Sequence, residues 1–170
     1  MATMSARGTR AIDVLRRAGV AHSVHEYETE PATGRDRDTR PSYGLDAAAA
    51  LEMDPRRIFK TLVATVDDRL AVTIVPVAAE LDLKRLADAL GGRRAAIADP
   101  AAAERATGYV VGGISPLGQR RPLPTVLDAS AGDNATIFVS AGRRGLQIEL
   151  APGDLARLVS AVVAPIARPR

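Results

Sequence analysis

The chain has 170 residues, 46% of them hydrophobic, so it can bury a hydrophobic core and we expect one domain over residues 1–170. It contains no cysteine, which excludes disulfide bonds, thiolate catalysis and thiolate metal sites. The net charge is only +3, and three tyrosines and two phenylalanines are too few for a base-stacking surface of the single-strand-binding kind. No segment has the apolar length that a membrane span needs, so we expect a cytoplasmic protein without a membrane partner.

The first part of the chain predicts a helix followed by a strand. Apolar residues recur at helical spacing over residues 11–18 and stop at Gly19, a typical helix end. Residues 21–28 then predict a strand, which carries both histidines. We expect residues 1–8 to be a flexible N-terminus. The polar and charged stretch 29–43 is expected to be a mobile loop.

The middle of the chain predicts two helices separated by a hairpin. Residues 45–53 are rich in alanine and predict a helix. The strand that holds Lys60 turns at the two aspartates of 67–68 into a second strand at 70–75. Residues 81–90 carry apolar side chains on one helical face and stop before a glycine pair, which predicts a helix with a glycine at its end.

The remaining elements alternate without a regular repeat. Asp99 and Pro100 form a typical helix start, with a capping aspartate and a proline in the first turn. Strands are predicted at 94–98, 109–111, 125–127, 135–139 and 146–150, and a closing helix at 154–163. Because hairpins and single helices replace βαβ units, we expect an α+β, or mixed α/β, fold.

The glycine pair Gly112-Gly113 is a candidate for a ligand-binding loop. It follows the apolar stretch 109–111 and precedes Pro116, which stiffens the exit from the loop. Glycine lacks Cβ, so it can adopt positive φ and let a ligand approach the main chain closely. Taken alone, the pair would favour an ordinary turn, since glycine pairs of this kind occur in most folds.

Lys60 is notable because Lys60 and Lys84 are the only lysines in a chain that otherwise uses arginine. It lies in the apolar stretch 58–63, where a lysine offers a compact ammonium with rotatable donors. The alternative is a lysine at a strand end whose ammonium simply reaches the solvent. If the chain is an enzyme, we expect an oxyanion-type site made by Lys60 and the amides of Gly112 and Gly113.

The two histidines are poor candidates for a catalytic triad or a metal site. His22 and His25 lie three residues apart on a predicted strand, so they face opposite sides of it. One of them could serve as a base, but a half-exposed strand histidine is more common. Two histidines at this spacing, without thiols, do not match a zinc site, and no P-loop motif is present. We therefore expect neither a metal nor a cofactor.

Several segments of the chain have a distinctive order and spacing. They are residues 25–28 with Tyr27, 59–62 with Lys60, 75–77 and 81–84, 107–119 with the glycine pair, and 140–146 with Ser140. Each segment is short, but their order over residues 9–168 resembles the YbaK/EbsC family. The similarity is closest to the YbaK-type deacylases that hydrolyse cysteinyl-tRNA(Pro).

The resemblance implies a mixed α/β domain with a central, barrel-like sheet surrounded by helices. It also implies an aminoacyl-tRNA deacylase that removes wrongly attached cysteine from tRNA(Pro), with prolyl-tRNA synthetase as a partner. In that family the thiol of the substrate cysteine attacks its own ester carbonyl, so the protein supplies no nucleophile. Such an enzyme needs no catalytic triad. This agrees with the sequence, in which His22 and His25 are poor candidates for one.

The resemblance further implies roles for individual residues. Lys60, Gly112 and Gly113 would be the catalytic residues, because they would position the aminoacyl end of the tRNA. The residues with implied substrate-binding roles are Tyr27, Phe59, Thr61, Ile114, Ser115, Pro116, Ser140 and Gln147. No metal ligand is implied.

Gln147 departs from the pattern of the family, which has aspartate at this position. Glutamine keeps a hydrogen-bonding oxygen but not the negative charge, so a role in binding the amino group of the substrate or in fixing Lys60 is in doubt. Two alternatives therefore stay open. One is a deacylase of the same superfamily that acts on alanyl-tRNA(Pro), and the other is a non-catalytic module that binds tRNA or a synthetase.

Overall fold

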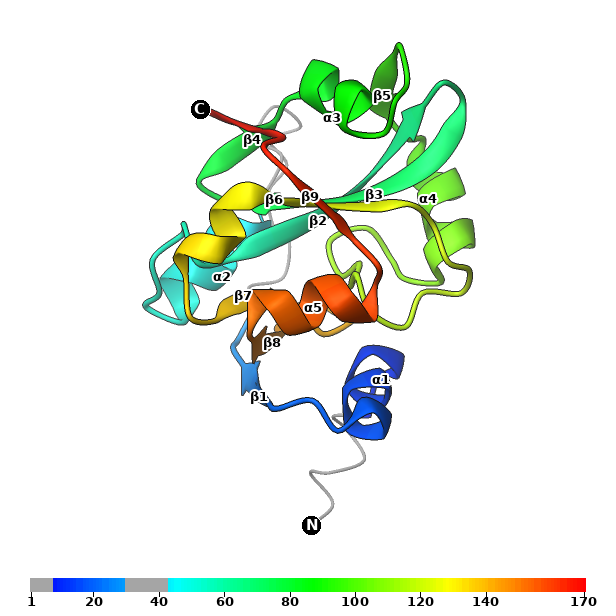
Figure 1. The fold of residues 1–170 in the computed structure, drawn as a ribbon. Helices are drawn as coiled ribbons and strands as arrows, with labels where there is room; N and C mark the ends of the chain where they lie inside the picture. The colour runs from blue at the N-terminus through cyan, green and yellow to red at the C-terminus, as the bar shows by residue number, and fades with distance from the viewer. Residues whose placement is uncertain (1–7, 30–42) are drawn as a thin grey trace, which may run out of the picture.

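The computed structural model describes residues 8–29 and 43–170, which form helices around three β-sheets (Figure 1). The helices are α1 (Arg10–Ala18), α2 (Tyr43–Ala50), α3 (Leu83–Ala89), α4 (Pro100–Thr107) and α5 (Pro152–Leu158). The strands are β1 (His22–Glu26), β2 (Phe59–Val66), β3 (Arg69–Pro76), β4 (Ala79–Leu81), β5 (Ala95–Ile97), β6 (Thr125–Asp128), β7 (Ile137–Ser140), β8 (Leu146–Leu150), β9 (Val162–Ala164) and β10 (Ala167–Pro169). The mixed α+β class is therefore confirmed.

The largest sheet is built on the hairpin of β2 and β3, which the sequence predicts. The two strands pair antiparallel along their whole length, and the turn has Asp67 at φ 48° and Asp68 at φ 67°. Two successive positive φ values are what a tight hairpin turn requires, and aspartate tolerates them better than most residues. β3 and β6 pair in parallel, as do β6 and β9, giving the mixed order β5-β2-β3-β6-β9.

Two smaller sheets complete the described fold. One has the order β1-β8-β7 and is antiparallel throughout, and the other is the antiparallel pair β10-β4. Within residues 8–29 and 43–170 the strands do not close into a barrel, so the barrel-like sheet expected from the resemblance is corrected to three separate sheets.

The predicted end of α1 and the predicted start of α4 agree with the structure. α1 stops at Gly19, which has φ 66° and donates its amide to the carbonyl of Arg16. The side chain of Asp99 accepts a hydrogen bond from the amide of Ala102, and Pro100 is the first residue of α4. These local signals act within a few residues of each other, which is why sequence alone can place them.

Two predicted elements are wrong. Residues 109–111 form no strand: Tyr109 is buried, whereas the side chains of Val110 and Val111 are 72% and 45% exposed in a turn after α4. The closing helix was expected over 154–163, but α5 ends at Leu158 and residues 162–164 become the strand β9. Its partner β6 lies more than thirty residues earlier, so no local pattern predicts this pairing.

The alternation of side chains along β2 divides the core into two faces. Phe59 packs in the main core, together with residues of α1, β7, β8 and α5. Lys60 and Leu62 point to the other face, where Leu62 and Ala64 pack against the cluster under α3. Thr61 shares the face of Phe59 and Val63 because residues two apart lie on the same side of a strand.

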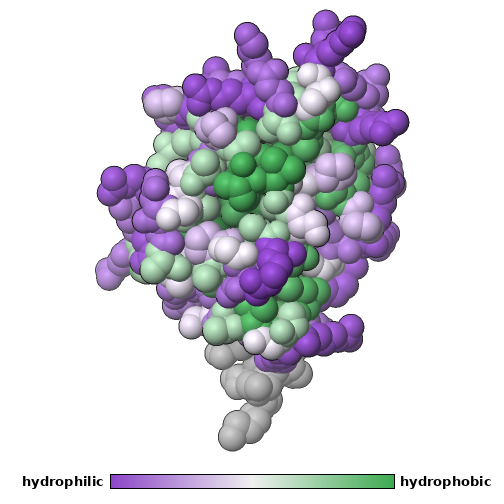
Figure 2. Space-filling model, viewed as in Figure 1, coloured by the Kyte–Doolittle hydropathy of each residue, from purple (hydrophilic) through white to green (hydrophobic). Residues whose placement is uncertain are grey.

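β9 forms an edge of the largest sheet and leaves apolar side chains at the surface. Val162 and Val163 are 45% and 55% exposed. β9 runs across the front of the view in Figure 1, and Figure 2 shows apolar side chains gathered near the middle of the same face. None of the helices in the described part of the chain combines the length and the apolar character that crossing a bilayer requires.

The flexible N-terminus and the mobile loop expected from the sequence lie almost wholly outside the described residues, in 1–7 and 30–42. The two expectations, and that of one domain over residues 1–170, therefore stay predictions.

Candidate active site

Gln147 lies at the centre of a row of polar residues on the three-stranded sheet. Its Cα is paired with that of Ser140 on β7 and with that of His25 on β1. Directly opposite residues on neighbouring antiparallel strands have their side chains on the same face of the sheet. Leu146 and Ile148, on either side of Gln147, point into the main core, so the row faces the other way, toward α2.

Lys60 extends this row onto β2. Ile58 forms a parallel bridge with Phe138, and both side chains pack in one apolar cluster with Ala48 of α2. Lys60 follows Ile58 by two residues, as Ser140 follows Phe138, so both polar side chains lie on this same face. The polar row therefore consists of Lys60, Ser140, Gln147 and His25, which come from four different strands.

The ammonium of Lys60 is held by the backbone. Its Nζ donates a hydrogen bond to the carbonyl of Ala79, at 2.9 Å, and its side chain is half-buried. Burial lowers the pKa of Lys60, the positive charge of Arg170 lowers it further, and Glu80 acts in the opposite direction. An ammonium has three N–H donors, and the contact with Ala79 uses one, which leaves two for a ligand.

The titration of Lys60 can be observed directly because the chain has only two lysines. We expect Lys60 to titrate below the ordinary lysine value of 10.5, and the substitution Arg170→Ala to raise its pKa by removing a neighbouring positive charge. Nuclear magnetic resonance of lysine-labelled protein gives two side-chain signals, which Lys60→Arg and Lys84→Arg assign. A Lys60 signal that titrates at or above 10.5 would contradict the burial and charge described above.

The glycine loop contacts the turn between β7 and β8, which directly follows Ser140. A Cβ added to Gly113 would lie only 2.8 Å from the Cα of Arg143, so the two backbones are in close contact. The amide of Gly113 already donates to the carbonyl of Val110, at 2.8 Å. Gly112 has φ 95°, and its amide donates to no other residue in the described ranges. Of the two expected amide donors, only that of Gly112 is thus available in this conformation.

Other residues of the loop are buried in this conformation. Ser115 is fully buried, and its Oγ accepts a hydrogen bond from the amide of Leu117, at 3.2 Å. Ile114 packs with Tyr109 and Val63, and Pro116 is buried too. Their side chains pack within the fold, and their substrate-binding roles stay predictions.

Phe59 is also buried. Its side chain is 2% exposed and packs in the main core, so it supports the start of β2 from behind Lys60. Its part in substrate binding stays a prediction.

Two buried side-chain oxygens have no hydrogen-bond partner among the described residues, Thr61 Oγ1 and Gln147 Oε1. Gln147 is 7% exposed, whereas Thr61 lies on the opposite face of β2 from Lys60, on the side where Ile114 packs. A buried acceptor without a partner costs free energy, so each such oxygen calls for an explanation such as a bound ligand or an ordered water.

Tyr27 borders a hollow of about 470 Å³ at the end of β1. Its amide donates to the carbonyl of Gly145, at 2.9 Å, which continues the pairing of β1 with β8. Residues 27–29, Arg144 and side chains of α2 line the hollow. The structure thus brings Tyr27 to the same turn that contacts the glycine loop.

The described residues contain no group of three or more histidine, aspartate or glutamate side chains that could hold a metal ion.

Comparison with known proteins agrees with this geometry. The family model for the aminoacyl-tRNA editing domain matches residues 42–158, which hold Lys60, the glycine loop, Ser140 and Gln147. The chain belongs to the aminoacyl-tRNA editing domain family. The expected YbaK-type identity and the expected class of enzyme, an editing deacylase, are confirmed at this level.

Individual relatives are consistent with that assignment. A curated protein of Enterococcus faecalis (strain ATCC 700802 / V583), "Putative Cys-tRNA(Pro)/Cys-tRNA(Cys) deacylase EbsC", is 40% identical over 147 residues, which cover 85% of this chain and 87% of the relative. A crystal structure described as "a putative trans-editing enzyme for prolyl tRNA synthetase" has a TM-score of 0.77 and 25% identity, covering 94% of this chain and 95% of that one. The crystal structure of a hypothetical protein has a TM-score of 0.80 at 19% identity, covers 94% and 100% of the two chains, and supports the fold alone.

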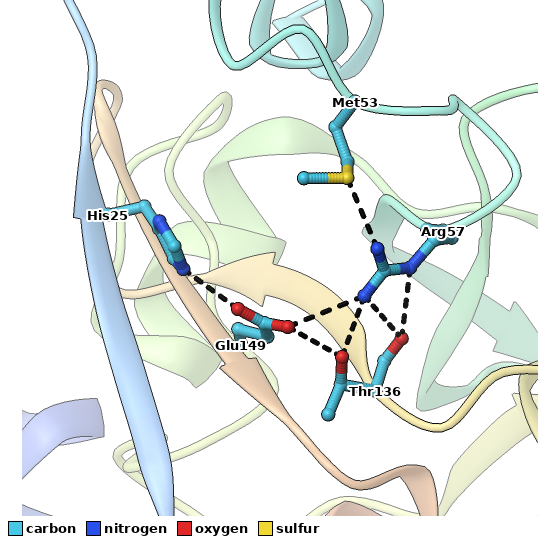
Figure 3. A network of polar contacts seen from close by, with 5 residues as sticks. All are labelled: His25, Met53, Arg57, Thr136 and Glu149. Carbon is cyan, nitrogen blue, oxygen red and sulfur yellow. Dashed lines mark hydrogen bonds and ion pairs between the residues drawn. The ribbon is translucent and has the colours of Figure 1, made fainter.

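The editing domain contains a network of polar contacts that the sequence analysis missed (Figure 3). Glu149 accepts hydrogen bonds from His25 Nε2, at 2.9 Å, and from Thr136 Oγ1, at 2.6 Å. Arg57 donates to Thr136 Oγ1 at 2.7 Å and lies 3.4 Å from Glu149. The hydrogen bond from Thr136, followed by the contacts with His25 and Arg57, holds the pKa of Glu149 below its ordinary value, although burial acts in the opposite direction.

This network joins the four strands that carry the polar row. Glu149 lies two residues after Gln147 on β8, His25 belongs to the row itself, and Arg57 and Thr136 come just before β2 and β7. The imidazole of His25 is thus bound to a carboxylate and also contacts the ring of Phe138. The signal that could have found the network is the alternation along β8, which places Gln147 and Glu149 on one face.

Proposed function

We propose that this editing domain deacylates cysteinyl-tRNA(Pro), the substrate class implied by the resemblance and by the printed name of the Enterococcus relative. The observation that carries the proposal is the polar row, in which the half-buried ammonium of Lys60 keeps two donors beside Ser140 and Gln147. Such a group can bind the ester carbonyl and stabilise the negative charge that develops on its oxygen.

The nucleophile in this mechanism comes from the substrate. The thiolate of the attached cysteine forms a bond to its own ester carbonyl carbon, the bond to the ribose oxygen breaks, and the proton of the thiol ends on that oxygen. The resulting cyclic thioester is then hydrolysed by water to free cysteine. Two features of the chain agree with a nucleophile that comes from the substrate. The chain has no cysteine, and His25 is hydrogen-bonded to Glu149 and not to a serine.

The residues would act by position and charge. Lys60 and the amide of Gly112 would hold the carbonyl oxygen, and Tyr27 and Ser140 would bind the rest of the aminoacyl end, whereas Thr61 lies on the opposite face of β2. Prolyl-tRNA synthetase would be the partner that releases or presents the substrate, in the cytoplasm. The test is hydrolysis of cysteinyl-tRNA(Pro) by the purified chain, which must depend on Lys60 and on the thiol of the substrate.

Gln147 is the residue that supports a second candidate function, binding without hydrolysis. Because it lacks the carboxylate of the family pattern, a chain that binds aminoacyl-tRNA without hydrolysing the ester is the alternative. Binding of cysteinyl-tRNA(Pro) with no ester loss at any protein concentration would favour that alternative. Equal cleavage of alanyl-tRNA(Pro) would instead favour the alanine-specific deacylase.

The substitution Gln147→Leu separates a role in binding from a role in folding. We expect the free energy of unfolding to stay the same or to rise by up to about 1 kcal/mol, because the change removes a buried oxygen that has no partner. We expect kcat/KM for cysteinyl-tRNA(Pro) to fall about tenfold, because the substrate loses a hydrogen-bond acceptor. Chemical denaturation and a deacylation assay on the same samples measure both. A variant that is less stable and equally active would show that Gln147 serves the fold instead.

A further inference from the structure

The last strand of the chain is part of the surroundings of Lys60. β10 pairs antiparallel with β4, and Pro169 lies opposite Ala79, whose carbonyl accepts the hydrogen bond from Lys60. Arg170 follows Pro169 directly, and Figure 1 shows the C-terminus beside β4. The pairing of β10 therefore brings Arg170 to the immediate neighbourhood of the site lysine.

A buried aspartate fixes this strand in place. Asp128 is 4% exposed, and its Oδ1 accepts hydrogen bonds from the amides of Ile166 and Ala167, each at 2.9 Å. Ile166 itself is fully buried in the cluster under α3. β10 is thus anchored at its start, so the position of Arg170 follows from the core and not from a loose tail.

The side-chain charges around Lys60 are mostly positive. Arg168, in β10, forms an exposed ion pair with Glu80, at 3.3 Å. Arg170 is exposed and forms no ion pair with another described side chain. Its charge is close enough to act on the ammonium of Lys60. Lys60 and Arg170 are therefore two neighbouring cations, and the one carboxylate that acts on Lys60, that of Glu80, is shared with Arg168. An anion bound beside Lys60 and Arg170 would relieve the repulsion between them.

We propose that Arg170 binds a phosphodiester of the tRNA acceptor end while Lys60 holds the acyl group that this end carries. A guanidinium suits this part because its fork of donors matches the oxygens of a phosphate. The inference rests on the proposed function for the identity of the RNA. The proposal adds a second contact with the substrate. At this contact the end of the chain after β10 binds the nucleic acid and not the amino acid.

The experiment compares two esters that differ in phosphate. One is cysteinyl-tRNA(Pro), and the other is cysteine esterified to adenosine, which carries no phosphate. With Arg170→Ala we expect KM for the tRNA ester to rise about five- to tenfold and KM for the adenosine ester, which has no phosphate for Arg170 to bind, to stay unchanged. The slope of log kcat/KM against log salt should become smaller by about one for the tRNA ester.

A matched control is Arg93→Ala, an exposed arginine near the far end of β2, about 20 Å along the strand from Lys60. It should leave both substrates and the salt slope unchanged. An equal loss on both esters with Arg170→Ala, or no loss on either, would overturn the proposal.

Binding of an uncharged acceptor-stem RNA to wild type and to Arg170→Ala tests the role of Arg170 separately from the proposed deacylase function. Arginine-dependent RNA binding without ester hydrolysis would contradict the proposed function alone, whereas RNA binding that is equal in both proteins would overturn the role of Arg170.

Discussion

Replacing Lys60 by alanine is expected to lower kcat for hydrolysis of cysteinyl-tRNA(Pro) about 100- to 1,000-fold. The reason is that Lys60 is the one charged donor of the polar row that keeps free N–H groups toward a ligand. Removal of a single donor to a developing oxyanion typically has an effect of this size. Steady-state kinetics with labelled cysteine measure the change.

The same substitution should leave the fold intact. Lys60→Ala removes one hydrogen bond to Ala79 but also relieves an ammonium that burial disfavours, so we expect the free energy of unfolding to change by less than about 1 kcal/mol. Lys84→Ala is the matched control, because Lys84 is the only other lysine and is exposed on α3. A Lys60→Ala protein that folds and keeps wild-type turnover would remove Lys60 from the mechanism.

Gly113→Ala is expected to lower both the free energy of unfolding and the deacylase activity. The added Cβ would lie 2.8 Å from the Cα of Arg143 and 3.1 Å from the amide of Arg144, and backbone atoms cannot move aside as a flexible side chain can. Overpacking of this kind typically lowers the free energy of unfolding by about 1 to 3 kcal/mol. Because the glycine loop would shift away from the turn between β7 and β8, activity should fall as well.

Gly153→Ala is the control for this change. Gly153 lies in the first turn of α5 with nothing within 4 Å of an added Cβ, so the substitution should be neutral or slightly stabilising. Thermal or chemical denaturation of the two variants gives the comparison. If Gly113→Ala is as stable as Gly153→Ala, the close contact between the glycine loop and the turn is not rigid.

The parts of the fold that sequence predicts correctly depend on short-range signals. The hairpin of β2 and β3 follows from two alternating apolar strands and two aspartates that adopt positive φ, and α4 follows from Asp99 and Pro100. The strands β4, β9 and β10 could not be predicted in this way. Each has three residues, and their partners lie far away in the sequence, so long-range packing decides their existence.

In the candidate site, too, some features follow from short-range signals and others from long-range packing. Strands are expected at 135–139 and 146–150, but the pairing of Ser140 with Gln147 comes from the register of β7 with β8 in the structure. The motif residues Lys60 and Thr61 were expected to line one pocket, yet the alternation along β2 puts them on opposite faces. Alternation along a strand is a local property, so the sequence alone separates these two side chains. The contact of Gly113 with Arg143 was not predictable, because the close approach of two loops depends on the whole fold.

The most direct test of the central claim is the release of labelled cysteine from cysteinyl-tRNA(Pro), measured beside release of serine and alanine from the same tRNA. Serine replaces the thiol by a hydroxyl of similar size, so it isolates the contribution of the thiol. We predict rapid, Lys60-dependent loss of cysteine and little loss of serine or alanine. Equal loss of all three amino acids would contradict the thiol-assisted mechanism, and loss of none would contradict the assignment of this chain as a deacylase.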